Sequence, residues 1–173
     1  MNQRMPAFAE IIVDRPVERF LHRFILSTRP IDELILVSPF IGPLKGVSVT
    51  LRRIVEKINA ERIKTYVVTN TPAPNRPAQQ AAIEILSNSL WTEIRYNDTL
   101  HAKVYVCHAS STGFALFGSG NLTETSINYR LEVGMIINER GQGIPLCKVL
   151  HEWALNKLRI LEGTRVVKRI GGR

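Results

Sequence analysis

The sequence predicts one α/β domain, in which a mixed β-sheet carries helices on both faces. Three features predict this class: apolar residues at helical spacing, short apolar runs between them, and two such runs that almost adjoin around Gly113. Runs joined by a tight turn pair antiparallel, whereas runs separated by a helix pair in parallel. The chain has 173 residues, of which 45% are hydrophobic, and this is enough for one sizeable core. We therefore expect residues 1–173 to fold as a single domain.

The first part of the chain alternates between helix and strand. We expect a helix from Asp14, which would cap it, with Pro16 in the first turn. Its inward face carries Val17, Phe20, Leu21 and Phe24. A buried strand at 33–37 ends in a loop at 38–43 that holds two prolines and a glycine. A second helix starts at about Ser48 and turns inward Leu51, Ile54, Val55 and Ile58.

Two further strands and a third helix follow. The strand at 64–69 runs into a proline-rich stretch at 70–77, which we interpret as a loop within the domain and not as a linker. A helix is expected at 79–86 and a strand at 91–96. This alternation is typical of strands that pair in parallel.

The second part of the chain is richer in strands. We expect strands at 101–107 and 114–117, joined by a turn at 110–113. A short helical turn at 123–127 then precedes a strand at 131–137. Adjacent strands of this kind make the predicted sheet mixed.

A helix and a basic tail end the chain. The helix starts near Pro145 and turns inward Leu146, Val149, Leu150 and Trp153. The tail, at about 160–173, concentrates basic residues in a way that suits phosphate contacts. A plain solubilising tail and a terminal strand with charged edges are equally compatible with this composition.

A histidine and a lysine lie two positions apart at the start of the strand expected at 101–107. Because side chains alternate along a strand, His101 and Lys103 share one face and can reach one ligand. Ser119 and Asn121 follow the next strand, in the sequence Gly-Ser-Gly-Asn. Glu132 interrupts an otherwise apolar strand, and a carboxylate in such a place needs a polar partner.

These residue types suit the chemistry of a phosphodiester. A histidine can attack phosphorus as a covalent nucleophile. A lysine ammonium, a serine hydroxyl and an asparagine amide can donate hydrogen bonds to the non-bridging oxygens. His101, Lys103, Ser119 and Asn121 can together attack, hold and release a phosphodiester without a metal ion.

The order of these motifs resembles the phospholipase D superfamily. The resemblance covers most of the chain and rests on four stretches, which are Ser38 to Phe40, His101 to Lys103, Gly118 to Thr123, and Asn128 to Glu132. A lone His-x-Lys or Gly-Ser-x-Asn sequence occurs by chance in many proteins. The two in order, followed by a glutamate eleven positions past Asn121, are hard to explain by chance. The family's sheet-and-helix architecture also agrees with the elements expected above.

The resemblance implies that two such sets build one active site. One histidine must attack the phosphorus while another, on the opposite side, protonates the leaving oxygen in line with it. This chain has one set, so we predict a symmetric homodimer in which two copies meet across the twofold axis. His101 of one subunit would form a phosphohistidine, and His101 of the other would act as general acid and then as general base.

The resemblance gives the other residues supporting roles. Lys103, Ser119 and Asn121 of each subunit would bind the phosphoryl oxygens, each well-placed donor stabilising the transition state by ~3 kcal/mol. Glu132 would accept a hydrogen bond from the far nitrogen of His101 and so fix its tautomer and orientation. The predicted catalytic set therefore has five residues, and the chemistry requires no metal and no other cofactor.

One position departs from the family pattern. The family usually has an aspartate five residues after the lysine, and this chain has His108 there. The spacer between Lys103 and Gly118 is also a few residues longer than in the compact members, and the turn at 110–113 can absorb the difference. In the family that aspartate mainly supports local structure, so no chemical role is lost with it. A weakened or specialised enzyme stays open as an alternative.

The charge balance favours nucleic acid as the substrate. There are 23 Lys and Arg residues against 15 Asp and Glu, which gives a formal charge of +8 and attracts polyanions. The chain also lacks a lipid-gripping hydrophobic excess, and so resembles the small dimeric nucleases of the superfamily. The candidate contacts to a nucleic-acid backbone are Arg52, Arg53, Arg76, Arg165, Lys168 and Arg169.

Several functions remain open at this point. The leading one is a metal-independent endonuclease on DNA, with RNA in second place and contacts largely to phosphate. The second is a phosphodiesterase of phospholipase D type acting on a lipid or another small diester. The third is a catalytically weakened DNA-binding dimer. A purely structural interpretation pairs His101 with Glu132 in the core and treats Ser119 and Asn121 as turn formers.

The sequence predicts neither secretion nor a membrane partner. Cys107 and Cys147 are too few for a disulfide framework, and we expect both to be small buried apolar groups. Residues 1–10 contain no apolar segment long enough for a signal peptide or a membrane span. We therefore expect a cytoplasmic protein.

Overall fold

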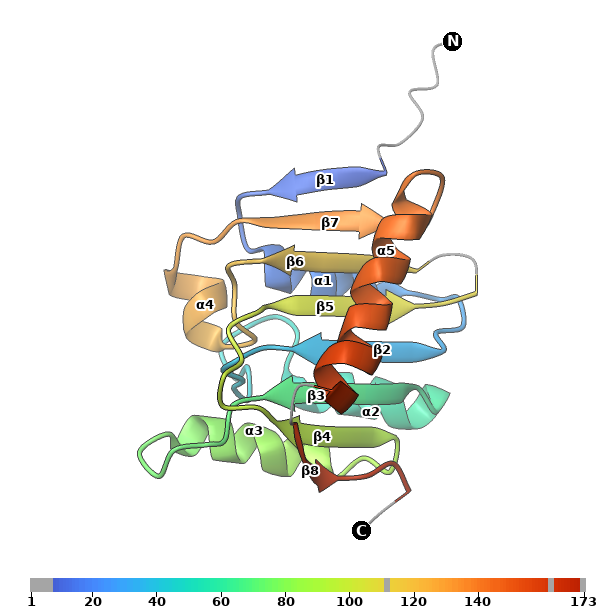
Figure 1. The fold of residues 1–173 in the computed structure, drawn as a ribbon. Helices are drawn as coiled ribbons and strands as arrows, with labels where there is room; N and C mark the ends of the chain where they lie inside the picture. The colour runs from blue at the N-terminus through green and yellow to red at the C-terminus, as the bar shows by residue number, and fades with distance from the viewer. Residues whose placement is uncertain (1–7, 111–112, 162–163, 172–173) are drawn as a thin grey trace.

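The computed structural model describes residues 8–110, 113–161 and 164–171. These residues form a mixed eight-stranded sheet in the order β1-β7-β6-β5-β2-β3-β4-β8 (Figure 1). The strands are β1 (Ala9–Ile12), β2 (Glu33–Val37), β3 (Lys64–Thr69), β4 (Thr92–Tyr96), β5 (Val104–His108), β6 (Phe114–Gly118), β7 (Gly134–Asn138) and β8 (Arg165–Lys168). The adjacent strands β2, β3 and β4 run parallel, and the other neighbouring pairs run antiparallel. The predicted mixed sheet is therefore confirmed.

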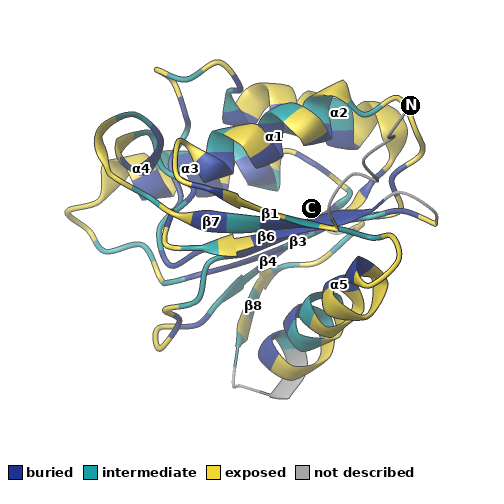
Figure 2. Ribbon diagram, turned by 90° about the horizontal axis from the view of Figure 1, so that it is seen from above, coloured by how far each residue is buried: buried dark blue, intermediate teal, exposed yellow. Residues whose placement is uncertain are grey.

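Helices cover both faces of the sheet, as predicted (Figure 2). On one face lie α1 (Pro16–Leu26), α2 (Leu51–Glu61) and α3 (Pro77–Ser87), with the short α4 (Glu124–Tyr129) beside them. On the other face α5 (Gly143–Glu152) continues as the π-helical segment η1 (Trp153–Leu161). Within the described ranges, no helix has both the length and the apolar character that a membrane crossing requires.

The sheet separates two hydrophobic layers. Along β5, Tyr105 and Cys107 face the layer beneath α1, α2 and α3, whereas Val104 and Val106 face the layer beneath α5. Side chains that are fully buried in the first layer include Phe20, Phe24, Leu34 and Leu36. Burial of each such side chain stabilises the fold by roughly 1.5–3 kcal/mol. This face therefore supplies most of the core.

Two helices begin later than the sequence predicts. The cap of α1 is Arg15 and not Asp14, because Pro16 occupies the first helical position and Arg15 takes a left-handed conformation with φ 47°. The cap of α2 is Thr50, whose hydroxyl accepts a hydrogen bond from the Arg53 N–H at 3.3 Å. Ser48 is not the cap because its hydroxyl bonds to side chains of α1 instead.

Two strands near the predicted site are shorter than expected. β5 begins at Val104, so His101 lies in the preceding loop and not in the strand. β7 begins at Gly134, so Glu132 also lies in a loop. Both strands start opposite the carboxyl end of their antiparallel partner β6, since Val104 pairs with Phe117 and Gly134 pairs with Gly118.

The inward face of α5 differs from the prediction. Leu146 and Val149 are 42% and 62% exposed, while Leu150 and Trp153 are half-buried. The side chains that contact the sheet are instead small, at Cys147 and later at Ala154. Small residues let the helix approach closely, and a Cβ at Gly143 would lie 1.9 Å from the carbonyl oxygen of Asn138. Close approach of the backbone has therefore decided which face turns inward.

The end of the chain resolves the alternatives that its basic composition left open. β8 pairs antiparallel with β4 at the edge of the sheet. Arg165 lies opposite Tyr96, and Lys168 lies opposite Ile94. Within the described residues, the basic tail is therefore a terminal strand with charged edges.

A hydrogen bond between His151 and Glu33 ties α5 to β2. Nε2 of His151 lies 2.6 Å from Oε2 of Glu33, and the two side chains are 20% and 19% exposed. Because a carboxylate only accepts hydrogen bonds, the ring nitrogen is the donor. This hydrogen bond lowers the pKa of the Glu33 carboxyl from its usual 4.5, against the opposing effect of burial. The pair is therefore a source of pH-dependent stability.

We predict that Glu33→Gln removes part of the acid sensitivity of the fold. A carboxyl whose pKa is lowered by folding stabilises the native state above its unfolded-state value, and this stabilisation disappears as the pH falls through the lower folded-state value. The variant should be less stable than wild type by about 1 kcal/mol near neutral pH, and the difference should vanish well below about pH 4. Urea unfolding followed by circular dichroism measures it. Exposed Glu84→Gln is the control, and a pH-independent difference for Glu33→Gln would contradict the assignment.

Candidate active site

The five predicted catalytic residues lie in loops at one end of the strands, which we call the site edge of the sheet. At this edge the carboxyl ends of β2, β3, β4 and β6 meet the amino ends of β5 and β7, because β5 and β7 both run antiparallel to β6. His101 and Lys103 precede β5, Ser119 and Asn121 follow β6, and Glu132 precedes β7. The fold thus brings together segments that are about thirty positions apart in the sequence.

Two buried hydroxyl groups hold the loop that follows β6. The fully buried Ser38 accepts a hydrogen bond from the Leu122 N–H at 3.0 Å and donates to the Phe40 carbonyl at 2.7 Å. The fully buried Tyr105 hydroxyl donates to the Gly120 carbonyl at 2.8 Å. Burial raises the pKa of Tyr105, so its hydroxyl keeps its proton and stays a donor. These bonds fix the backbone of the loop against β2 and β5.

The first glycine of this loop is required by the close approach of two backbones. Gly118 ends β6 and pairs with Gly134 at the start of β7. A Cβ at Gly118 would lie 2.3 Å from the Val133 carbonyl oxygen and 2.7 Å from the Gly134 Cα. These are backbone atoms, which cannot move without disturbing β7. The glycine therefore lets Ser119 lie against the segment that carries Glu132.

Glu132 is the centre of a hydrogen-bond network that joins the two loops. One carboxylate oxygen accepts from the Ser126 hydroxyl at 2.6 Å, and the other accepts from the Ser119 hydroxyl. The Ser126 oxygen accepts in turn from the Asn121 N–H at 2.8 Å. The Val133 N–H donates to the Ser119 oxygen at 3.1 Å. The network fixes Ser119, Asn121 and Glu132 relative to one another.

Sequence reasoning missed Ser126, which connects two members of the predicted set. Its side chain lies in the first turn of α4, and the residue is 5% exposed. A signal for it was present, because Thr123 caps α4 by accepting the Ser126 N–H at 3.2 Å. Thr-x-x-Ser has the spacing of a capping box, with Ser in place of the usual Glu or Gln, and Ser126 accepts from Asn121 instead of from the cap residue.

His101 and Lys103 lie next to the network but are not bonded to its side chains. The Lys103 carbonyl accepts from the Gly118 N–H at 3.3 Å, and the Lys103 ammonium donates to the His101 carbonyl at 2.9 Å. His101 is exposed, and among the described residues none hydrogen-bonds to its ring. The expected hydrogen bond between His101 and Glu132 therefore stays a prediction, since the bonds of this carboxylate go to Ser119 and Ser126.

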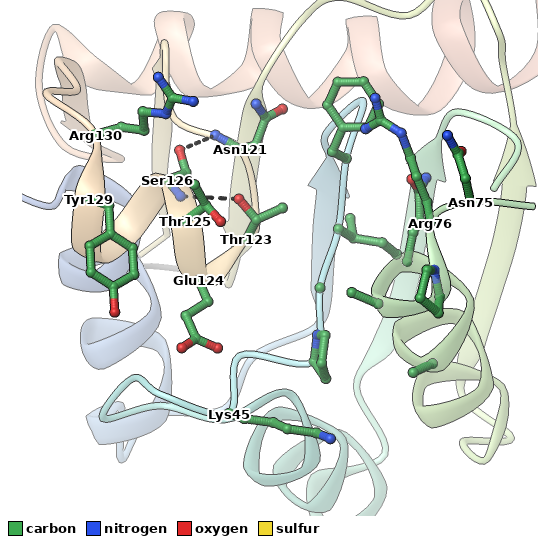
Figure 3. Close-up of a pocket in the computed structure, with 18 of the residues that line it drawn as sticks. Lys45, Asn75, Arg76, Asn121, Thr123, Glu124, Thr125, Ser126, Tyr129 and Arg130 are labelled. Atoms are coloured by element: carbon green, nitrogen blue, oxygen red, sulfur yellow. Dashed lines mark hydrogen bonds between the residues drawn. The ribbon is translucent and has the colours of Figure 1, made fainter. Parts of the chain in front are cut away.

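A pocket of about 1050 Å³ opens beside the network (Figure 3). Residues within three segments line it: 40–45 after β2, 75–81 at the start of α3, and 121–132 around α4. Asn121 and Glu132 belong to this lining, so the pocket and the network share residues. The pocket therefore borders the hydrogen-bond network of Glu132.

The predicted nucleic-acid contacts near α2 and α3 lie on the pocket side of the molecule. Arg76 lines the pocket, and its guanidinium carbon lies 4.1 Å from the centre of the Phe40 ring. Arg52 and Arg53 are exposed on α2. Arg52 and Lys45 line a second hollow of about 380 Å³. Of these predicted contacts, Arg76 is the one that shares a pocket with Asn121.

The three predicted contacts on and after β8 are not among the residues that line the pocket. The Arg165 guanidinium lies 5.1 Å from the centre of the Tyr96 ring, at the end of β4 nearest the site. The Lys168 ammonium donates to the carbonyls of Ser89 at 2.6 Å and Thr92 at 2.8 Å, at the opposite end of that strand. Arg169 is exposed beyond it. The Lys168 charge is thus used to join β8 to β4.

His108 lies at the other end of β5 from the site. Its ring centre is 4.6 Å from that of His151, and its Nδ1 is 3.5 Å from Oε1 of Glu139. These contacts join β5 to α5 and to the segment after β7. The histidine that replaces the aspartate expected from the resemblance therefore occupies a structural position.

Neither cysteine is a candidate nucleophile. Burial raises the pKa of Cys107 to about 12 and the pKa of Cys147 to about 11, so both thiols stay protonated near neutral pH. Both are buried, as predicted. In the part of the chain that the structure describes, no three His, Cys, Asp or Glu side chains are grouped so that they could hold a metal ion.

Solved structures contain the same arrangement of strands and helices. A phospholipase D family member, Nuc from Salmonella typhimurium, is 16% identical, with a TM-score of 0.63 over 93% of this chain and 99% of that chain. NucT from Helicobacter pylori is 13% identical, with a TM-score of 0.57 over 85% of this chain and 94% of that chain. Phosphatidylserine synthase from Haemophilus influenzae is 15% identical, with a TM-score of 0.57 over 94% of this chain and 40% of that chain.

These likenesses confirm the fold that the motif resemblance implied. No protein-family model and no curated protein sequence matches the chain. At 13–16% identity, the solved structures share an architecture with this chain, and the chemistry has to be argued from its own residues.

We predict that Gly118→Ala destabilises the protein by about 1–3 kcal/mol, as overpacking of a tight site does. The added methyl group would press on the backbone of Val133 and Gly134. Gly42→Ala is the matched control, because a Cβ there would meet its nearest atom at an ordinary 3.7 Å. Urea unfolding of both variants measures the difference, and equal stabilities would refute the close-approach argument.

Proposed function

We propose that this chain, which has the fold of phospholipase D family members, is a metal-independent phosphodiesterase that acts as an endonuclease on DNA, with RNA as the alternative nucleic acid. One observation carries the proposal. In this fold His101 and Lys103 lie beside the loop that bears Ser119 and Asn121, and backbone pairing joins the two segments. A nucleophile and several donors for phosphoryl oxygens thus lie at one edge of the sheet.

The reaction needs two copies of this edge. A ring nitrogen of His101 in one subunit attacks phosphorus and forms a P–N bond while the bond to the leaving oxygen breaks. His101 of the partner subunit, protonated, gives its proton to that oxygen. The same partner histidine then takes a proton from water, which attacks phosphorus and breaks the P–N bond. One His101 cannot lie on both sides of the phosphorus, so we infer a homodimer.

The neighbouring side chains then stabilise the charge of the transition state and orient the reacting groups. Lys103 and the Asn121 amide donate to the non-bridging oxygens as negative charge gathers there, and Ser119 joins them by turning its one hydroxyl proton from Glu132 to a phosphoryl oxygen. Glu132 holds the Ser119 hydroxyl and retains lone pairs beyond the two used by Ser119 and Ser126. Those lone pairs are available to accept from the far nitrogen of His101.

An exposed apolar strip beside the site supports the homodimer. It comprises Ile11, Val13, Phe117 and Val133, which are 66%, 74%, 39% and 50% exposed. Ile11 and Phe117 both pair with Met135, so their side chains lie on one face of the sheet. Figure 1 shows that α5 crosses that face and leaves the ends of β1, β7 and β6 near α4 uncovered. A second copy seated on this strip would bring its own His101 near the first.

The charge of the molecule supports nucleic acid over lipid. The formal charge of +8 attracts a polyanion, and Arg76 lies in the pocket that Asn121 and Glu132 line. One protein with this fold is a phosphatidylserine synthase, so the fold itself does not select the substrate. A lipid or small diester therefore remains the second candidate, and a DNA-binding dimer without activity the third.

We predict that His101→Ala abolishes cleavage of DNA in the presence of excess chelator. Removal of a covalent nucleophile should lower the rate by about 1000-fold or more. The assay uses plasmid and single-stranded DNA, together with bis(p-nitrophenyl) phosphate as a small diester. His22→Ala is the control, because His22 bonds to Ser48 at 2.7 Å on the α1 side and should not affect cleavage.

Three outcomes would count against parts of this proposal. Cleavage that requires a divalent metal would refute the mechanism. Turnover of a lipid headgroup without cleavage of nucleic acid would favour the second candidate. Binding of DNA with a steep salt dependence and no hydrolysis of any diester would favour the third.

We predict that activity falls as the square of the wild-type fraction when wild type and His101→Ala are unfolded and refolded together. A dimer with a single His101 lacks either the nucleophile or the acid, so only dimers of two wild-type chains work. A mixture of equal amounts of wild type and His101→Ala should keep a quarter of the activity that the same total amount of wild type shows. A control mixture of wild type with His22→Ala should lose none, and a linear loss with His101→Ala would show a site complete in one chain.

A further inference from the structure

We propose that the pocket beside Asn121 binds unpaired nucleotides next to the scissile phosphate, so that single-stranded nucleic acid is the preferred substrate. This inference rests on the proposed function and adds to it the strandedness of the substrate. Asn121 and Glu132 line the pocket and also belong to the predicted catalytic set, whose other members are not among the lining residues. A strand whose phosphate is held by Asn121 can therefore extend into the pocket.

The shape of the pocket favours a single strand. Its volume of about 1050 Å³ is set between α4 on one side and the start of α3 on the other (Figure 3). Pockets of roughly 300–1000 Å³ enclose ligands of small-molecule size, and a few unpaired nucleotides fit this scale. A double helix is a wide rod that hides its base faces in the stack and cannot enter such a hollow without opening.

Two aromatic groups in the pocket walls can stack with bases. Tyr129 is the last residue of α4 and is 76% exposed, so its ring contributes little to the core. On the opposite wall, the Phe40 ring carries the Arg76 guanidinium at 4.1 Å. A planar guanidinium already laid on a ring presents a flat cationic surface to a base or a phosphate. Aromatic and arginine faces of this kind bind unpaired bases with little sequence preference.

The charges of the pocket suit a phosphate backbone. Lys45, Arg76 and Arg130 line it, against the carboxylates of Glu124 and Glu132. Glu132 is held by two serine hydroxyls. Glu124 lies against the loop after β2, since a Cβ at Gly46 would be 2.2 Å from its Oε1. The lining thus carries three cations against two carboxylates, and hydrogen bonds already occupy one of these carboxylates, Glu132.

The test measures binding in the His101→Ala background, so that no cleavage intervenes. A fluorescently labelled single-stranded oligonucleotide and the duplex of the same sequence are titrated at one fixed salt concentration. We expect tighter binding of the single strand. Tyr129→Ala and Arg76→Ala should each raise its Kd by about tenfold, within the range that loss of one base stack produces. Tyr129→Phe, which keeps the ring, should restore most of the affinity.

The matched control is Arg29→Ala, which removes an exposed arginine at the opposite edge of the sheet. It should change the Kd by less than twofold. Equal binding of single strand and duplex, or equal effects of Arg29→Ala and Arg76→Ala, would overturn the inference. So would binding of anionic phosphatidylglycerol vesicles that the pocket substitutions weaken while oligonucleotide binding stays undetectable.

A second measurement separates this inference from the proposed function. Hydrolysis of bis(p-nitrophenyl) phosphate by the protein with His101 intact reports the chemistry on a diester too small to span the pocket. No hydrolysis, together with pocket-dependent binding of the single strand, would refute the phosphodiesterase and leave the nucleotide pocket standing. Hydrolysis together with binding that the pocket substitutions do not change would do the reverse.

Discussion

The hydrogen bonds from the hydroxyls of Ser119 and Ser126 to Glu132 join the loop after β6 to the loop before β7. Regular pairing of these strands ends at Gly118 and Gly134, so the side chains take over where the ladder stops. A carboxylate that accepts from two hydroxyls forms stronger bonds than neutral groups do. The backbone of Asn121 and the first turn of α4 take their positions from the same bonds.

The buried hydroxyls beneath this network make the loop rigid from the other side. Ser38 at the end of β2 and Tyr105 in β5 bond to the loop backbone and lie in the core of the sheet. Donors that are fixed before the substrate arrives need no reorganisation when charge develops on a phosphoryl oxygen. By contrast the ring of His101 is exposed and open to a partner. In the proposed mechanism the rigid half of the site would hold a phosphate, and the open half would meet a second subunit.

The two proposed partners, a second subunit and a nucleic acid, would bind to different surfaces on either side of the same edge. The apolar strip of Ile11, Val13, Phe117 and Val133 lies on the sheet face that α5 only partly covers. Helices α3 and α4 lie on the other side (Figure 2), and the pocket, with its cations and Tyr129, lies between them (Figure 3). An apolar surface suits another protein chain and a basic one suits a polyanion. This edge can therefore bind a second subunit and a nucleic acid at the same time, without competition between them.

The sequence by itself determined the mixed α/β sheet, most of its elements, and the identity of the residues at the site edge, because apolar periodicity and short motifs are local properties. Tertiary contacts decided what local patterns could not encode. Ser48 bonds to α1 and leaves the cap of α2 to Thr50, and small residues under α5 set its inward face. The bonds of Glu132 to Ser119 and Ser126 form because β6 and β7 pair and set the intervening loop and α4 beside this carboxylate.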